Sequence, residues 1–409
     1  MTGVLLAAGG VQRLQFFIPA SRAAFPGWMA GPLGGLGIRP TPEQASLLLV
    51  AMFACYLVVL ACAGALPVRL AIGAAVTLHL AFMLAPPLFS ADVFGYIDFG
   101  RLAALHHVNP YLHGTAAAPL DAVHPFVRWR DSGSAYGPLF TLSTLALVPL
   151  GVAGSLWTLK ALTAAAGLGC MALVWRLARR LGHDPLPATL FVGLNPLLLA
   201  FEVGGGHNDL LVMLLVLLGA LALVESGMAI GGGLLATASW VKPPVGLLLP
   251  LAAVAHRFDR RLLAGVAAAS AAAVAAGWLA FGRHTFGFVT QIRAEQHLVA
   301  HNSVPGRLVV WLELPGVPGW LRALFLLALG AALIALLLAV VRRRMNWIPA
   351  GGWSLLALLV TSAWLLPWYP VWVLPLAAVA DDRRLRVGTL ALCGWTLATR
   401  LGPWLPGAL

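Results

Sequence analysis

The chain alternates long apolar runs with short polar connections, and this pattern predicts a bundle of membrane-spanning helices. A helix needs about 20 apolar residues to cross the hydrocarbon core of a bilayer. Runs that approach this length occupy 46–66, 69–88, 155–175, 186–203, 209–226, 262–281, 320–341, 347–364, 365–380 and 386–405. With two further apolar stretches, at 138–153 and 231–255, the pattern predicts an all-α polytopic membrane protein of about 10–13 transmembrane helices.

Two long polar connections, 89–137 and 283–318, interrupt this series, and no internal repeat is evident in the sequence. We therefore expect a single transmembrane domain over 46–409. The Gly- and Pro-rich residues 1–45 form a separate N-terminal segment, which holds either a weak first span at 3–20 or an interfacial stretch.

Composition supports the membrane assignment. Hydrophobic residues make up 60% of the 409 residues and charged residues 10%, against about 45–50% and about 25% in soluble domains. The net charge of +12 comes from arginine runs between apolar segments, at 175–180, 256–261, 341–345 and 381–386. This is the positive-inside pattern of a multi-pass protein and not a nucleic-acid-binding stripe. The four cysteines lie inside apolar runs without the spacing of a disulfide framework or a metal site.

Placing the arginine runs in the cytoplasm predicts that both long loops lie outside the cell membrane, 89–154 with a juxtamembrane helix at 138–153. Both ends of the apolar stretch 231–255 then lie inside, which one straight helix does not allow. The prolines in "VKPP" at 241–244 interrupt the backbone hydrogen bonds of a helix. We therefore predict a broken or re-entrant helix pair with Lys242 near its apex.

Ionisable residues at membrane depth are costly and are functional candidates by default. They share a predicted position near the outer half of the membrane: Asp92, Asp98, Arg101, Glu202, His207, Asp209 and Lys242. This convergence predicts a polar site on the outer side, with no metal because the histidine pair His106–His107 lacks ligand spacing.

Asp92 stands at the exit of an apolar run, before Phe94, Tyr96 and Phe99. A carboxylate partly shielded from water has a raised pKa and suits a general base. The alternative is a helix cap, with Asp92 accepting hydrogen bonds from free backbone amides. Asp98 and Arg101 are three residues apart, which favours a structural pair on one helix face.

The second unusual stretch is "EVGGGHNDLL" at 202–211, whose three glycines permit close backbone approach. It lacks the Lys-Ser/Thr ending of a phosphate-binding P-loop. Asn208 or Asp209 is a candidate cap for the next helix, and His207 either faces substrate or packs structurally.

Cations and aromatic residues complete the candidates. Lys242 suits a phosphate, with snorkelling to the interface as the alternative, and Lys160 is a second phosphate candidate. Asn109 opens a turn, and Tyr111 is placed to stack on a sugar. In "LLPWYPVWVLP" at 365–375, Trp368 and Tyr369 are candidates to flank a sugar or a prenyl chain, whereas Trp372 reads as part of an aromatic belt.

Five runs, in this order, resemble the bacterial integral-membrane GT-C glycosyltransferases. They are "DVFGYIDFGRLAALHHVNPY", "YGPLF", "NPLLLAFEVGGGHNDLL", "VKPPVGLLLP" and "PWYPVWVLPL". The nearest groups are the polyprenol-phosphate-mannose-dependent α-1,6-mannosyltransferases and glycosyltransferase family 87. The resemblance covers about residues 85–380 and rests on several motifs together.

The resemblance implies a GT-C-like bundle in the bacterial plasma membrane with an extracytoplasmic active site. It implies transfer of mannose from a polyprenyl-monophosphate donor to a glycan or lipid-linked acceptor, without a cofactor, and assigns Asp92 as the catalytic base. Lys242 matches the basic position of the broken helix, and His207 with Asp209 matches the "HND" motif. Further substrate contacts are expected from Lys160, Arg101, Asp98, Tyr96, Asn109, Tyr111, Tyr136, Glu202, Trp368 and Tyr369. The alternative class is a transporter or flippase, because broken helices with a membrane-embedded lysine also occur there.

Overall fold

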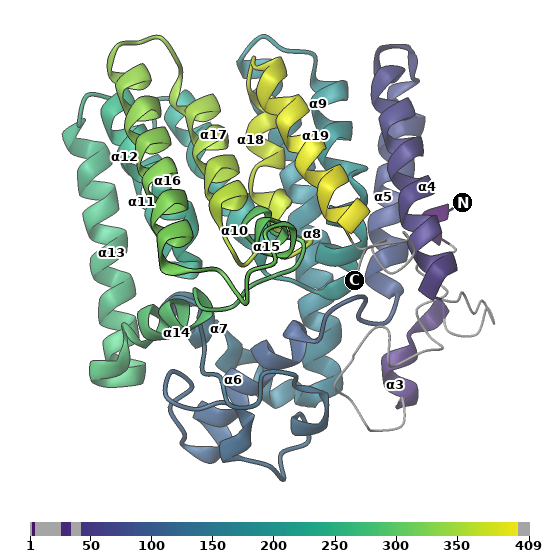
Figure 1. Cartoon of the computed structure of the whole chain (residues 1–409), viewed down its shortest axis with the longest axis vertical. Coiled ribbons are helices and arrows are strands. Elements are labelled where there is room, and N and C mark those ends of the chain that lie inside the picture. Colours follow the sequence, from purple (N-terminus) through teal and green to yellow (C-terminus); the bar gives the residue numbers. More distant parts are fainter. Residues whose placement is uncertain (1, 5–25, 34–41, 400–409) are drawn as a thin grey trace.

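The computed structural model describes residues 2–4, 26–33 and 42–399, and in this part of the chain it holds helices and connections without strands. The possible weak span at 3–20 falls almost entirely outside the described residues. Long helices run side by side in the upper part of Figure 1, and the short helices α6 (Asp92–His106) and α14 (Gly287–Glu295) lie at their lower end.

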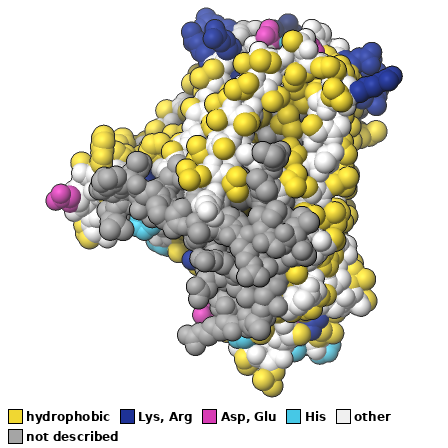
Figure 2. All heavy atoms as spheres, turned by 90° about the vertical axis from the view of Figure 1, so that its right-hand side faces the viewer, with side chains coloured by type: hydrophobic (Ala, Val, Ile, Leu, Met, Phe, Trp, Pro, Cys, Tyr) yellow, Lys and Arg dark blue, Asp and Glu magenta, His cyan; other side chains and the backbone are white. Residues whose placement is uncertain are grey.

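Four segments are long and apolar enough to cross a membrane, which confirms the all-α polytopic class for the described residues. They are Gln44–Ala61, Pro138–Arg180, Arg260–Glu295 and Gly319–Val341. Five shorter apolar helices accompany them: Val68–Leu84, Asp209–Val224, Met228–Val241, Pro243–Ala255 and Trp347–Thr361. Figure 2 shows hydrophobic side chains along the flank of the bundle and Lys and Arg side chains gathered at its upper end, as expected for a multi-pass membrane protein.

The bundle is built from helices that follow the predicted runs closely. In chain order they are α4 (Pro42–Ala61), α5 (Val68–Leu84), α8 (Gly151–Arg180), α9 (Pro185–Gly193), α10 (Asp209–Val224), α11 (Met228–Val241), α12 (Leu248–Ala255), α13 (Arg260–Phe281), α16 (Gly319–Val341), α17 (Trp347–Thr361), α18 (Leu374–Val379) and α19 (Arg383–Ala398). A short α3 (Gly27–Ala30) precedes them, and α7 (Pro138–Ser143) and α15 (Val304–Trp311) lie in the two long connections.

Helix α11 packs closely against α13, and glycine makes this approach possible. A Cβ atom on Gly265 would lie 1.9 Å from the carbonyl oxygen of Ala229, and one on Gly232 would lie 2.4 Å from that of Leu262. Small residues at helix contacts let backbones approach in this way in membrane bundles. The packing holds α11, and therefore the lysine that follows it, in a fixed position.

The predicted break at 241–244 is confirmed. Helix α11 ends at Val241, and Lys242 has extended backbone angles (φ −143°, ψ 105°). A 3₁₀ turn, Pro243–Leu247, then leads into α12. The two prolines lack the amide hydrogens that a continuing helix would need, so the lysine is left at the break.

Two predicted spans are corrected. The run 186–203 is not one helix, because α9 ends at Gly193 and a π-helical turn, Leu198–Val203, follows Pro196. The run 365–380 is divided into a 3₁₀ turn, Tyr369–Trp372, and the short α18, since its prolines interrupt the hydrogen-bond ladder.

Residues 138–150 of the predicted juxtamembrane stretch 138–153 form elements distinct from the long α8, which begins at Gly151. Helix α7 begins with Pro138 at its first position, where proline is tolerated. A 3₁₀ turn, Thr144–Leu150, follows, and Gly151 with φ of +66° leads into α8. Its place along the outer membrane face stays a prediction.

Candidate functional site

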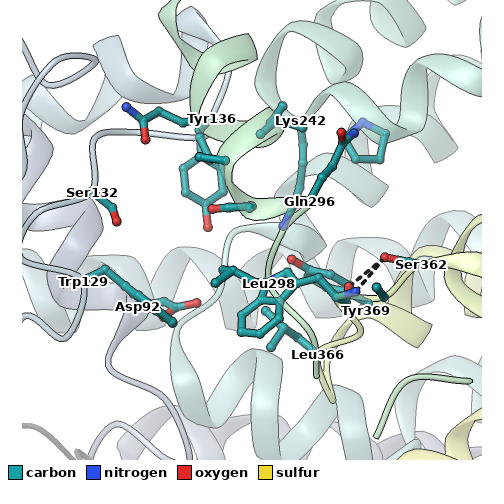
Figure 3. A pocket seen from close by; sticks show the side chains of 18 of the residues that line it. Asp92, Trp129, Ser132, Tyr136, Lys242, Gln296, Leu298, Ser362, Leu366 and Tyr369 are labelled. Atoms are coloured by element: carbon teal, nitrogen blue, oxygen red, sulfur yellow. Dashed lines mark hydrogen bonds between the residues drawn. The ribbon is translucent and has the colours of Figure 1, made fainter. Parts of the chain in front are cut away.

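A cavity of about 690 Å³ lies where α6 and the first long connection meet the broken helix pair. Further walls come from the α14–α15 connection, from α16 and α17, and from residues 361–369. Figure 3 shows side chains from these distant segments converging on one space. Of the residues expected at the site, the cavity is lined by Asp92, Tyr96, Asp98, Tyr136, Lys242, Trp368 and Tyr369.

Asp92 is the first residue of α6, and its side chain faces the cavity with 20% of its surface exposed. The helix-cap alternative is wrong. Ala91 holds the cap position without a side-chain bond, and the Ser90 hydroxyl accepts the Asp92 amide hydrogen at 3.1 Å. Burial raises the pKa of Asp92 to about 6, with a partial offset from the Ser90 hydrogen bond and the positive charges of Lys242 and Arg128. The carboxylate is therefore available to accept a proton.

A row of polar side chains leads from the cavity wall to Asp92. The Tyr136 hydroxyl donates to that of Tyr96 at 3.1 Å, and the Tyr96 hydroxyl lies 3.4 Å from Nδ1 of His207. The same Nδ1 is 3.9 Å from Oδ2 of Asp92. His207 is fully buried, and its ring stacks on Trp368 with centroids 3.9 Å apart. The stack fixes the plane of the His207 ring. His207 does not itself line the cavity and contacts Asp92 from behind.

Lys242 is held by one carboxylate and three aromatic rings. Its ammonium forms an ion pair with Oδ1 of Asp209, the first residue of α10, and that oxygen also accepts the indole hydrogen of Trp372. Nζ lies 5.4 Å from the ring centres of Tyr136 and Tyr369 and 5.2 Å from that of Trp372, within cation–π range. The aromatic-belt interpretation of Trp372 is wrong, because its side chain is buried against this ion pair.

Glu202 lies in the π-helical turn, fully buried and away from the cavity lining. Neither of its carboxyl oxygens has a hydrogen-bond partner among the described residues, and the same holds for Oδ2 of Asp209 and Nε2 of His207. Glu202 interacts electrostatically with Asp209 and Lys242. It therefore belongs to the charged layer behind the cavity.

The predicted Asp98–Arg101 pair is wrong. Arg101 instead binds Oδ1 of Asp121 at 2.7 Å, and His106 binds the other oxygen of Asp121 at 2.7 Å. Oδ1 of Asp98 has no hydrogen-bond partner among the described residues, and burial raises the pKa of Asp98 to about 7. The spacing of three residues places Asp98 and Arg101 on one face of the helix. The carboxylate of Asp121, from the following loop, nevertheless lies closer to the Arg101 guanidinium and binds it.

Three further predicted contacts belong to the scaffold. The fully buried Lys160 donates to the carbonyl oxygens of Phe82, Val203 and Gly204 at 3.1, 3.2 and 2.5 Å, which corrects its assignment to phosphate. The Tyr111 hydroxyl lies within hydrogen-bond distance of the Tyr136 carbonyl oxygen (3.1 Å) and the Thr141 hydroxyl (3.2 Å), and its ring packs at 81° to that of Phe281. Asn109 accepts the Tyr111 amide hydrogen at 2.9 Å. These side chains are occupied and do not line the cavity.

Comparison with known proteins identifies the family of the chain. The family model described as "Alpha-(1->6)-mannopyranosyltransferase, N-terminal domain" matches residues 44–258, and the model of the MptB C-terminal domain matches residues 298–401. The chain belongs to this mannopyranosyltransferase family. All the side chains of the charged layer and the first loop lie within the first match.

Curated relatives agree with the family. An alpha-(1->6)-mannopyranosyltransferase A of Mycobacterium tuberculosis is 29% identical over 350 residues, covering 77% of this chain and 66% of the relative. A probable alpha-(1->6)-mannopyranosyltransferase of Mycolicibacterium smegmatis is 28% identical over 367 residues, covering 76% and 65%. The chain thus spans just under two thirds of the length of these relatives. No solved structure gives a significant match.

Within this mannopyranosyltransferase fold, the cavity has lining residues that the sequence analysis did not find. Arg128 and Trp129 come from the loop after α6, and Glu295 closes α14. All three lie in segments where polar residues are common. The sequence feature that could have pointed to Arg128 and Trp129 is the basic–aromatic alternation "RWR" at 128–130.

The scaffold role of Lys160 in this family member gives a testable prediction. Lys160→Met leaves three buried carbonyls without their donor, so we expect a loss of about 2–4 kcal/mol in the free energy of unfolding. Thermal unfolding in detergent measures it. Leu162→Met, on the exposed side of the same helix, is the control and should leave Tm unchanged. If Lys160→Met left Tm unchanged and weakened the affinity for the donor, Lys160 would be a substrate contact and not a scaffold residue.

Proposed function

We propose that the chain is a membrane α-(1→6)-mannosyltransferase that uses a polyprenyl-monophosphate mannose donor. The acceptor is a glycan or lipid-linked glycan on the extracytoplasmic side, and Asp92 is the general base. The observation that carries the proposal is a partly buried carboxylate in a cavity that is lined both by polar side chains and by apolar side chains of α16 and α17. Family membership and the activity named for the relatives support mannosyl transfer.

The apolar side chains that line the cavity support a lipid-linked donor. They include Phe325, Leu326 and Leu329 of α16 and Leu358 and Leu359 of α17. Leu326 also keeps 67% of its surface exposed on a helix that is among the most apolar of the chain. A prenyl chain lying along the cavity face of α16 would therefore remain in contact with bilayer lipid while its phosphate reached Lys242.

Lys242 is the proposed phosphate contact, because it lies at the break of the helix pair and lines the cavity. The incoming phosphate shares the ammonium with Asp209 and adds negative charge that the lysine stabilises as the leaving group departs. The outer orientation is supported by the arginine runs, which gather at the end of the bundle away from α6.

In the proposed reaction an acceptor hydroxyl lies beside Asp92 and attacks the anomeric carbon of mannose. The new carbon–oxygen bond forms as the bond from that carbon to the phosphate oxygen breaks, and the hydroxyl proton passes to Asp92. Polyprenyl phosphate leaves with the bonding electron pair. His207, clamped by Trp368, orients the Asp92 carboxylate through the Nδ1 edge of its ring.

The raised pKa of Asp92 predicts the pH dependence. A base is active in its deprotonated form, so kcat/KM should fall about tenfold per pH unit below about 6 and level off above it. A pH profile of transfer at subsaturating donor measures this. A flat profile between pH 5 and pH 7 would contradict the assignment.

A transfer assay tests the function itself. The protein, purified in lipid nanodiscs, is supplied with polyprenyl-phosphate [¹⁴C]mannose and α-(1→6)-linked mannotetraose. We expect a labelled pentasaccharide without any ion gradient, and none from GDP-mannose. Movement of intact donor across sealed vesicles, without a labelled saccharide product, would instead favour the transporter or flippase class.

A further inference from the structure

The loop of residues 127–134 forms one wall of the cavity, and its backbone is fixed by the chain around it. The carbonyl of Arg130 accepts the Ala116 amide hydrogen at 2.8 Å, and the Ser134 amide donates to the carbonyl of Pro110 at 2.7 Å. Gly114 allows this fit, because a Cβ atom there would lie 2.4 Å from the Arg130 oxygen. Side chains at the turn of the loop are therefore presented to the cavity from a defined position.

Arg128 and Trp129 are presented in this way, and both are exposed. Trp129 keeps 41% of its surface accessible, and its ring meets Trp364 edge-on with centroids 6.1 Å apart. The Arg128 guanidinium lies 5.4 Å from the Trp129 ring centre. It forms no hydrogen bond or ion pair with any side chain or backbone group of the described residues. The scaffold thus makes no polar use of this guanidinium.

Trp129 lies on the Asp92 side of the cavity. Figure 3 shows Trp129 and Ser132 beside Asp92, with Lys242 and Gln296 across the space from them. The positive charge of Arg128 acts on the Asp92 carboxyl. The lipid-facing residues of the cavity lining come from other elements, α16 and α17.

We propose that Arg128, Trp129 and Trp364 form the acceptor subsite, which holds a pyranose ring of an incoming saccharide chain. This rests on the proposed function, in which the base lies between acceptor and donor phosphate. An acceptor hydroxyl must approach Asp92 from the side opposite Lys242, and the Trp129 loop occupies that side.

The chemistry of the loop fits a neutral saccharide. A pyranose has a face of C–H groups that packs on an indole ring, while its rim of hydroxyls needs hydrogen-bond partners. The Arg128 guanidinium supplies several donors in a fixed plane next to that ring. Trp364 stands nearly perpendicular to Trp129, at 79°, and adds a second aromatic surface next to the Trp129 ring.

Separate kinetics for the two substrates test the proposal. Trp129→Ala should raise the KM for α-(1→6)-linked mannotetraose about 5- to 30-fold, since a ring stack contributes about 1–2 kcal/mol. The KM for the polyprenyl-phosphate mannose donor should change less than about twofold. Arg128→Gln should raise the acceptor KM to a smaller extent, and Trp129→Phe should retain most of the affinity. Trp311→Ala is the control, because Trp311 is 87% exposed and does not line the cavity.

An unchanged acceptor KM in Trp129→Ala, or a rise confined to the donor KM, would overturn the proposal. Direct binding of mannotetraose, followed by saturation-transfer NMR in detergent, separates this outcome from failure of the proposed function. If the wild type binds the saccharide and Trp129→Ala does not, the subsite stands even when no transfer is observed. Absence of wild-type binding refutes it. Should Trp129→Ala lower Tm, Arg128→Gln and Trp129→Phe carry the comparison.

Discussion

Asp92→Asn is expected to lower kcat by about 10²–10⁴-fold, the usual contribution of a positioned general base. The carboxamide has the same shape but does not accept the acceptor proton. The fold should be unaffected, because the Asp92 side chain does not cap the helix and its ion-pair contact with His207 is long, at 3.9 Å. Initial rates of mannosyl transfer and Tm, measured on the same preparation, separate the two effects.

Asp98→Asn is the matched comparison, since Asp98 lies on the same helix and also lines the cavity. The kcat of this variant should fall less than about tenfold, because a contact to a substrate hydroxyl contributes about 1 kcal/mol. Near-wild-type turnover of Asp92→Asn would remove Asp92 from the mechanism. Equal losses of kcat in the two variants would indicate that both carboxyl groups bind the sugar and that neither acts as the base.

Breaking the Lys242–Asp209 pair is expected to have the largest effect on stability. Both side chains are at least nine-tenths buried, and removal of one partner leaves the other charge without compensation at a cost of about 3–5 kcal/mol. Lys242→Met and Asp209→Leu should each lower Tm markedly, by more than the change at Lys160. Thermal or denaturant unfolding in detergent measures the loss.

The double variant Lys242→Met/Asp209→Leu distinguishes structure from catalysis. With both members of the ion pair gone, neither leaves an uncompensated buried charge, and much of the stability should return. Transfer activity should not return, because the donor phosphate has lost its cation. A double variant as unstable as the single ones would contradict the pairing, and one with wild-type transfer would contradict the phosphate role of Lys242.

The helical class and the break at 241–244 were predictable because each depends on local sequence. Apolar runs need a non-aqueous environment wherever they fold, and Pro243 and Pro244 lack amide hydrogens in any context. The same reasoning singled out Asp92 and Lys242, since an ionisable group among apolar neighbours is costly unless the fold uses it. The prediction failed at 186–203 and 365–380, where hydropathy alone did not register the effect of internal prolines.

The partners of individual side chains were harder to predict from the sequence. Spacing suggested that Arg101 faces Asp98, but its partner Asp121 comes from the loop that folds back over α6. Lys160 looked like a free cation and instead holds carbonyls from two other segments. Helical spacing identifies neighbours on one helix only, and the position of a charge along a span does not identify its partner. A charge in a low-dielectric interior pairs with the group that three-dimensional packing brings closest.

By itself the sequence determined that this chain is an all-α membrane protein with a broken helix at Lys242 and a small set of costly ionisable residues. These properties follow from composition, hydropathy and proline chemistry, which act over a few residues at a time. Only the tertiary structure decided which of those residues share a cavity. The aromatic rings around Lys242, the stack of His207 on Trp368 and the exposed Arg128–Trp129 pair join positions far apart in the chain. Their contacts exist because helix packing brings distant segments together.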